Sequence, residues 1–366
     1  MKIRIDKPLA AIIATLVVGG IFIFVSAAFG LLARGETHTS SVVFNHLVLG
    51  LGLGLLSLFV TALVEYRTWR TWSPYLFGAA LLATALVFIP AVGFMHGGGR
   101  RWIEIFGITF QPSEALKITS ILLAATYFSA LKEKIHTWRG VAGFLAILVL
   151  PAGILIAQPD IGTLGIVVIS VLAIYMTAGA RWRDLALVGF IGLLMFASLA
   201  FMRPYMLERV TTFISPGDNP LGEGYQIKQS LIAIGSGGFF GRGFGQGVQK
   251  FTYLPEPMGD SIFAVAAEEF GFIGGIAIIA LFLSLALRGF AIATRTPDLF
   301  GALAAVGIAT YFVSEGFINI ASMVGIAPLT GIPLTFISQG GSAMLVSLGT
   351  AGILLNISRK SAKRIS

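Results

Sequence analysis

The sequence predicts an all-α integral membrane protein with ten transmembrane helices, and three observations support this fold class. Hydrophobic residues make up 56% of the 366 positions and charged residues only 11%, against about 25% charged residues in soluble domains. The apolar residues gather in ten runs of roughly the length that a spanning helix requires. Lys and Arg concentrate in alternate connections, as in multi-pass membrane proteins. This composition excludes a soluble enzyme, a nucleic-acid-binding protein and a secreted disulfide scaffold.

The ten expected spans form a single polytopic membrane domain over residues 1–366. They cover residues 8–33, 43–64, 74–94, 112–131, 140–157, 162–180, 184–203, 258–287, 299–325 and 334–357. The connection between the seventh and eighth spans, residues 204–257, is polar, glycine-rich and far longer than the others. Apolar and aromatic residues run through it, so we expect a partly ordered loop that packs on the spans. Connections of this length are usually functional when they are ordered.

The distribution of charge predicts the orientation of the chain. Most of the 25 Lys and Arg, including those at both termini, fall on one side of the expected spans, which indicates cytoplasmic termini. The net charge of +8 therefore reflects topology, and no nucleic acid is expected as a partner. Most acidic residues fall in outer segments or within spans, which places the chemistry at the outer face. The absence of cysteine excludes disulfides and a cysteine nucleophile.

Charged residues inside spans are costly and are functional candidates by default. Glu114 and Lys117 are three residues apart in the fourth span, a spacing at which helical side chains can pair. Two interpretations stay open: a buried structural ion pair, or a pair that lines a cavity and contacts a polar or anionic substrate. Glu268, Glu269 and Glu315 also lie in apolar runs.

Two aspartates and an arginine near span ends have both a structural and a functional interpretation. Asp260 precedes the eighth span, where an acid is favoured by the helix dipole. Asp160 follows Gln158 and Pro159 in a tight turn that is typical of a helix cap. Arg101, ahead of Trp102, is expected either to bind a phosphate or to anchor the chain at the interface.

Five segments occur in an order that resembles a known family. They are QPSEALK (111–117), QPDIGT (158–163), GEGYQIKQSLIAIGSGG (222–238), YLPEPMGDSIFAV (253–265, followed by Glu268 and Glu269) and PLTFISQGGS (333–342). Together they resemble the SEDS family (shape, elongation, division and sporulation), whose members include FtsW and RodA. The resemblance covers roughly residues 90–357. Gly259, Ser261, Gln339 and Ala343 depart from the usual residues, but every charged motif residue is present.

The resemblance implies a peptidoglycan glycosyltransferase. Such an enzyme polymerises lipid II at the outer face of the bacterial cytoplasmic membrane, inverts the anomeric centre and releases undecaprenyl pyrophosphate. The implied partners are a class B penicillin-binding protein, other divisome or elongasome proteins, and membrane lipid. Asp260 is the expected catalytic base. The expected substrate-binding residues are Glu114, Lys117, Asp160, Arg101, Arg209, Gln226, Gln229, Ser230, Ser236, Glu256, Ser338 and Ser342.

No organic cofactor is expected, whereas Mg²⁺ or Mn²⁺ bound by Asp260 is one way to neutralise the leaving pyrophosphate. Gln249 and Lys250, just before 253–256, favour the FtsW division branch over a RodA-like elongation polymerase. Two other functions fit ten spans and a lipid-linked ligand: a lipid II flippase, and a non-catalytic scaffold for a penicillin-binding protein. The motif residues lie near the outer side rather than along a whole transport path, which favours the enzyme.

Overall fold

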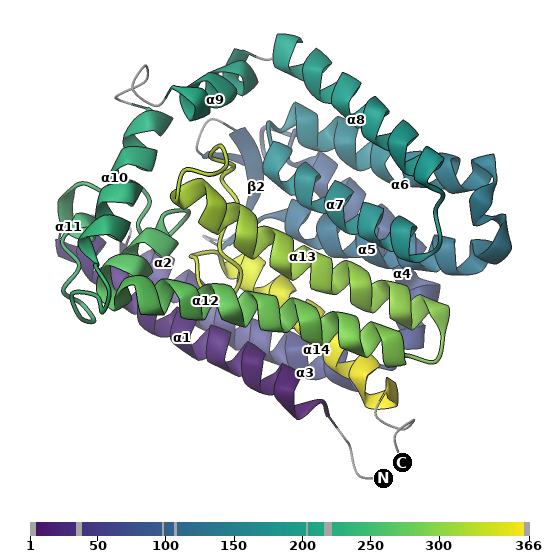
Figure 1. Ribbon diagram of the computed structural model, residues 1–366, viewed down its shortest axis with the longest axis horizontal. Helices are drawn as coiled ribbons and strands as arrows, with labels where there is room; N and C mark the ends of the chain where they lie inside the picture. Colours follow the sequence, from purple (N-terminus) through teal and green to yellow (C-terminus); the bar gives the residue numbers. More distant parts are fainter. Residues whose placement is uncertain are drawn as a thin grey trace.

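The computed structural model is an all-α bundle with one small sheet (Figure 1). It describes residues 5–33, 39–96, 99–105, 108–202, 204–215 and 222–361. Among these residues, eight helices are long and apolar enough to cross a membrane. The apolar helix α7 (Ile161–Thr177) is shorter, and α4 (Tyr66–Leu86) carries Arg67 and Arg70 in its first turns. With these two helices, the ten-span layout predicted from the sequence is confirmed.

The other elements complete the bundle in chain order. They are α1 (Lys7–Ala33), α2 (Thr39–Phe44), the π-helix η1 (Asn45–Gly52), α3 (Leu53–Leu63), α5 (Pro112–Leu131), the 3-10 helix η2 (Lys132–His136), α6 (Trp138–Ala157), α8 (Trp182–Met202), α9 (Pro204–Ile214), α10 (Glu223–Ser236), α11 (Gln249–Thr252), α12 (Ile262–Arg295), α13 (Leu299–Met323) and α14 (Gly341–Ser361). The helix α13 packs against α12, α7 and α5 and is central to the bundle. In contrast, α8 is the least buried of the long apolar helices.

The third span differs from its prediction over 74–94. The helix α4 begins at Tyr66, whose buried backbone N–H donates to Asn356 Oδ1 (2.9 Å), and it ends at Leu86. Charged side chains in its first turns are exposed, so the helix starts before the apolar run does. Turns replace the helix beyond Leu86 because Pro90 cannot donate a helical hydrogen bond.

An antiparallel sheet that the sequence analysis did not anticipate connects α4 to α5. It contains β1 (Gly93–His96), β2 (Gly99–Ile105) and β3 (Ile108–Phe110), with β2 in the centre. The sheet, α10 and α11 lie at the end of the bundle opposite the two termini (Figure 1). The described part of the long connection is helical in α9, α10 and α11, and α10 packs against α12.

The eighth span is interrupted near its start. Within α12, Gly271 has a φ of +66°, a conformation that favours glycine, so residues 262–270 form a short separate helix. The last span begins at Gly341 rather than at 334, because residues 324–340 form turns and extended chain. Ser338 and Gln339 of this segment contact the turn before α12, where Ser338 Oγ donates to Gly259 O (2.8 Å) and Gln339 N to Met258 O (2.7 Å).

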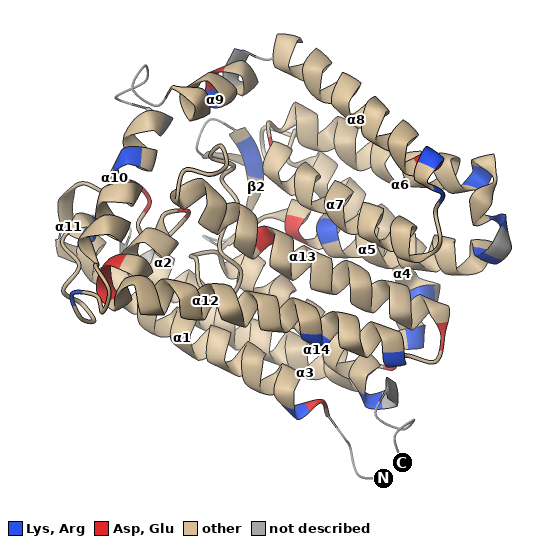
Figure 2. Cartoon of the chain, in the orientation of Figure 1, with Lys and Arg blue, Asp and Glu red and all other residues tan. Residues whose placement is uncertain are grey.

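Figure 2 shows that Lys and Arg residues gather at the end of the bundle that holds both termini. Red and blue segments also lie inside the bundle beside α13, and at the opposite end near α10 and α12. The interior charges belong to the site described next.

Candidate functional site

A polar cavity of about 70 Å³ lies inside the bundle, among α5, α7, α13 and the segment before α14. Its lining comprises Arg101, Trp102, Gln111, Glu114, Lys117, Asp160, Thr163, Ile166, Glu315, Gly331, Ile332 and Pro333. A volume of this size holds several water molecules but not a whole sugar. The sequence-predicted residues Glu114, Lys117, Asp160 and Arg101 therefore meet around one cavity.

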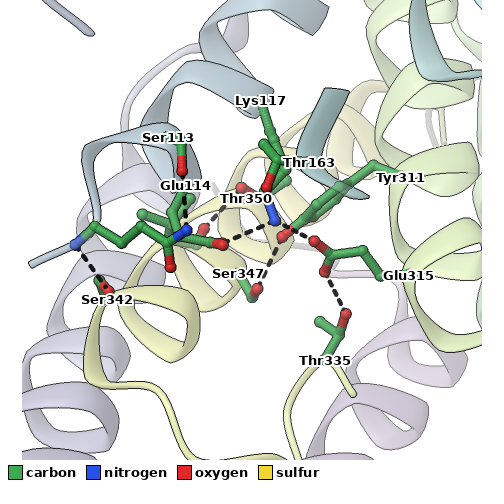
Figure 3. Close-up of polar contacts among 12 residues, drawn as sticks. Ser113, Glu114, Lys117, Thr163, Tyr311, Glu315, Thr335, Ser342, Ser347 and Thr350 are labelled. Carbon is green, nitrogen blue, oxygen red and sulfur yellow. Dashed lines mark hydrogen bonds and ion pairs between the residues drawn. The ribbon is translucent and has the colours of Figure 1, made fainter. Parts of the chain in front are cut away.

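Lys117 lies between two carboxylates (Figure 3). Its Nζ is 2.9 Å from Glu114 Oε2 and also donates to Glu315 Oε1, while Thr335 Oγ1 donates to Glu315 Oε2 (2.5 Å). All three charged side chains are buried. The expected pairing of Glu114 with Lys117 is confirmed, and the cavity interpretation gains support because both residues line the cavity. Since two carboxylates neutralise Lys117, this ammonium is a poor ligand for pyrophosphate.

Asp160 caps α7, because its Oδ1 accepts from Thr163 N (3.3 Å). Its Oδ2 lies 3.4 Å from both Ser113 Oγ and Gln111 Nε2, so the helix cap also connects α7 to the start of α5. Ser342 Oγ accepts from Gln111 N (3.2 Å) and adds the start of α14 to this contact. The structural interpretation of Asp160 as a helix cap is confirmed, and its role in substrate binding stays a prediction.

Arg101, in the central strand β2, fixes the turn before α7. Its Nη2 donates to Pro159 O (2.5 Å) and its Nε to Gln158 O (3.2 Å). The Gln158 side chain in turn donates to Thr84 O in α4 (2.7 Å). These bonds orient the Arg101 guanidinium at the cavity, where its remaining N–H groups can meet an anion.

Asp260 lies two residues before α12 and is half-buried. A Cβ atom placed on Gly331, which lines the cavity, would be 3.8 Å from Asp260 Oδ2. Asn319 Nδ2 donates both to Asp260 O (2.9 Å) and to Ile332 O (2.8 Å). Asp260 is therefore adjacent to the wall of the cavity, although it comes from a different part of the sequence.

The electrostatic environment of Asp260 includes both signs. The pKa of Asp260 is raised to about 6, mainly by burial and also by the negative charge of Glu256, while Arg209 and Arg101 partly oppose this shift. Arg209 and Glu256, both proposed for substrate binding, are thus close enough to influence Asp260. A carboxylate of this pKa is a stronger base than an ordinary aspartate.

The remaining predicted residues divide between this site and other contacts. Gln226 Nε2 donates to Ser261 Oγ (3.0 Å), next to Asp260, and Ser338 contacts Gly259. Gln229 is half-buried on α10. Ser230 contacts Met323 Sδ (3.4 Å) between α10 and α13, and Ser236 bonds within α10 and approaches Glu268 (3.4 Å). Ser230 and Ser236 thus contact packing partners, and their substrate roles stay predictions.

A second charged cluster holds the glycine-rich loop 237–248 against the break in α12. Glu268 Oε1 accepts from Val248 N (2.8 Å), and Glu269 Oε2 accepts from Gly245 N (3.1 Å). A Cβ atom on Gly241 would lie 2.1 Å from Glu269 O, so no larger residue fits this contact. The loop is therefore closely packed on the bundle, as the sequence analysis expected.

Lys250 is the buried cation of this second cluster. Its Nζ donates to Glu269 Oε1 (2.5 Å) and to Ser26 Oγ of α1 (2.7 Å), and Ser26 also bonds Glu269. Since Lys250 precedes Asp260 by ten residues, the cluster ties the chain leading to Asp260 to α1 and α12.

Lys250→Met is expected to destabilise the protein by about 3–5 kcal/mol, because it leaves the Glu269 carboxylate buried without its cation. Adding Glu269→Gln should recover much of this loss. The measurement is thermal unfolding of the purified protein in detergent. Arg242→Met is the control, since Arg242 is partly exposed at 3.7 Å from Glu268, and the Glu268 carboxylate keeps its bonds from Val248 N and Gln249 N. Equal unfolding temperatures for Lys250→Met and the control would refute the stabilising role.

Two residues of the site were not among the expected catalytic and substrate-binding residues. Glu315 was noted as an intramembrane acid, but its partner Lys117 lies about two hundred residues earlier and no spacing reveals the pair. Asn319 was overlooked, although a polar amide in the apolar run 299–325 was a usable signal. Among the described residues, no group of three or more His, Asp or Glu side chains forms a metal site.

Comparisons with known proteins place the chain in a family. A family model described as "Cell cycle protein" (FTSW_RODA_SPOVE) matches residues 7–363. Stage V sporulation protein E of Bacillus subtilis is 42% identical over 311 residues, which cover 85% of each chain. The probable peptidoglycan glycosyltransferase FtsW of Trichlorobacter lovleyi is 36% identical and covers 96% of this chain and 93% of its own.

Solved structures of other proteins match this chain over nearly its whole length. A chain of a structure described as "Structural coordination of polymerization and crosslinking by a peptidoglycan synthase complex" has a TM-score of 0.81 and 29% identity, covering 98% of this chain and 99% of its own. The rod shape determining protein RodA of Thermus thermophilus has a TM-score of 0.70 and 27% identity, covering 97% of each chain. The sequence, the fold and these matches together show that the chain belongs to the FtsW/RodA/SpoVE family, the SEDS family that its motifs resemble.

Proposed function

We propose that this protein is a peptidoglycan glycosyltransferase that polymerises lipid II for septal cell-wall synthesis. The observation that carries the proposal is the placement of Asp260 beside the polar cavity, in a chain of this family. Several relatives at 34–39% identity are named probable peptidoglycan glycosyltransferase FtsW, which favours the division branch.

The active site faces outward and both termini are cytoplasmic. This orientation is supported by the Lys and Arg residues that gather at the end with the termini, following the positive-inside rule (Figure 2). The sheet, whose strand β2 contains Arg101, and α10, whose Gln226 contacts Ser261 next to Asp260, lie at the opposite end (Figure 1). Lipid-linked head groups then meet Asp260 at the membrane surface while their polyprenyl tails stay in lipid.

The chemistry is a single inverting displacement. Asp260 accepts the proton of the acceptor sugar's 4-hydroxyl as this oxygen bonds to the donor's anomeric carbon. The bond from that carbon to the pyrophosphate oxygen breaks, and the pyrophosphate leaves with the electron pair. Since the donor is α-linked, one displacement gives a β-linked product. Because a carboxylate is a weak base toward an alcohol, proton transfer accompanies bond formation, and positioning of the two sugars supplies much of the rate.

Arg101 and Arg209 are the cations that neutralise the leaving pyrophosphate, since both influence Asp260 electrostatically. Asp260 and Glu256 supply two carboxylates nearby. These two side chains would hold a Mg²⁺ or Mn²⁺, because magnesium is commonly bound by one or two carboxylates together with substrate phosphates. Such a cation would add positive charge at the leaving group. The buried Glu114, Lys117 and Asp160 instead suit polar groups of one sugar at the cavity.

A class B penicillin-binding protein is the proposed partner, as the match to a chain of a peptidoglycan synthase complex supports. The test uses liposomes that contain the purified protein, this partner and fluorescent lipid II. Glycan polymer that forms only with the protein supports the enzyme. Lipid II that crosses the bilayer without polymerising would instead indicate a flippase. An inactive protein that nevertheless binds the partner would indicate a scaffold.

The rate of polymerisation is expected to rise as pH increases through about 6, because Asp260 must be ionised to act as a base. Glu256→Gln should shift this midpoint to lower pH, since it removes the like charge that raises the Asp260 pKa. Arg209→Gln should shift it to higher pH. The measurement is kcat/KM against pH, which reports the pKa of the enzyme without bound substrate. Midpoints that move in the same direction in both variants would contradict this electrostatic account.

A further inference from the structure

Asn319 joins the two halves of the site through a single amide group. Its Nδ2 donates to the backbone oxygen of Asp260 (2.9 Å) and to that of Ile332 (2.8 Å), which lines the cavity. The side chain is buried, and its Oδ1 has no hydrogen-bond partner among the described residues. Among the described residues, the Asn319 amide therefore forms hydrogen bonds only with these two carbonyl groups.

Both segments that Asn319 connects lack regular secondary structure. Asp260 lies in the turn before α12, and Ile332 lies in the segment between α13 and α14. Without a helical or strand ladder, their relative position depends on a few side-chain and turn contacts, including those of Ser338 and Gln339 with the 258–259 backbone.

Asn319 itself lies on a regular helix that also forms the cavity. Glu315 is four residues earlier in α13, so the two side chains share one face of that helix. Glu315 holds Lys117, and Asn319 holds the backbone of Asp260. One face of α13 thus sets the distance between the cavity and the carboxylate of Asp260.

We propose that Asn319 is a positioning residue, which holds Asp260 at the cavity wall so that its carboxylate meets the acceptor hydroxyl. The inference rests on the proposed glycosyltransferase function. A misplacement of about 1 Å can lower a rate by about 100-fold, which is the scale of effect that such a residue controls.

The test compares Asn319 with a second buried asparagine that makes the same kind of bridge elsewhere. Asn356 of α14 donates to Ala62 O (2.8 Å) and accepts from Tyr66 N (2.9 Å), among helices away from the cavity lining. Asn319→Ala, Asn319→Asp, Asn356→Ala and Asn356→Asp are purified in detergent. Thermal unfolding gives the folded fraction, and lipid II polymerisation gives kcat and KM per folded protein.

Both Asn319 variants should lower kcat by about 10- to 100-fold with KM within about twofold of wild type. The aspartate variant keeps the volume of the side chain but loses the donor group, so it separates donation from packing. The Asn356 variants should lower the unfolding temperature while kcat per folded protein stays at the wild-type value.

Equal kcat values for the Asn319 and Asn356 variants would overturn the positioning role, as would a rise in KM without loss of kcat. Failure of both Asn319 variants to fold, while the Asn356 variants fold, would also overturn it, because Asn319 would then be needed for folding itself. A wild-type protein that makes no polymer would refute the proposed glycosyltransferase function rather than the positioning role of Asn319.

Discussion

Asp260→Asn is expected to abolish lipid II polymerisation while the protein stays folded in the membrane. Asparagine has nearly the same shape but cannot accept a proton, so the contribution of a general base, about 10²- to 10⁴-fold, is lost. The Asn319 and Ser338 bonds involve backbone oxygens of Asp260 and Gly259, so they survive the substitution. The measurement is polymer formed per folded protein, with thermal unfolding measured in parallel.

Asp298→Asn is the matched control for this substitution. Asp298 caps α13, where its Oδ2 accepts from Gly301 N (3.1 Å), and asparagine is an equally good helix cap. The control should therefore polymerise lipid II at nearly the wild-type rate. Wild-type turnover by folded Asp260→Asn would remove Asp260 from the reaction.

Lys117→Met is expected to cause the second large loss, in both stability and activity. It leaves Glu114 and Glu315 buried together without their cation, at a cost of about 3–5 kcal/mol. Loss of the Lys117 ammonium also changes the charge inside the cavity, which both carboxylates line. Thermal unfolding and polymerisation of the same preparation measure the two effects.

The exchange of charges, Glu114→Lys combined with Lys117→Glu, separates a simple ion pair from a cavity with a required arrangement. A simple pair would work in either order. Here the new glutamate at position 117 would face Glu315, which holds the lysine in the native protein. We therefore expect the double variant to remain inactive, and full recovery of polymerisation would show that only the pairing matters.

The sequence indicated the spans well because a bilayer requires a long apolar helix at each crossing. It was less informative where the chain departs from that rule. The start of α4 at Tyr66 depends on contacts with Asn356, and the break at Gly271 depends on the loop 237–248 packing against α12. The sheet around β2 has strands of three to seven residues, too short to leave a clear pattern.

The site was predictable as a set of residues but not as an arrangement. The free-energy cost of a charge inside a membrane span identified Glu114 and Lys117 as candidates, and the family motif identified Asp260. Neither source could show that Glu315 is the second partner of Lys117, or that Asn319 connects Asp260 to Ile332. These contacts form across large sequence separations because α13 lies between the two halves of the site, and this placement is a property of tertiary packing.

The most direct test of the proposed activity is the product that the purified protein makes from labelled lipid II, with its penicillin-binding protein present. Moenomycin is included to inhibit contaminating glycosyltransferases of the classical penicillin-binding type. We predict long glycan chains that a muramidase specific for β-linkages degrades to disaccharides, with release of undecaprenyl pyrophosphate. Unchanged lipid II, or a polymer that resists this muramidase, would contradict an inverting lipid II polymerase.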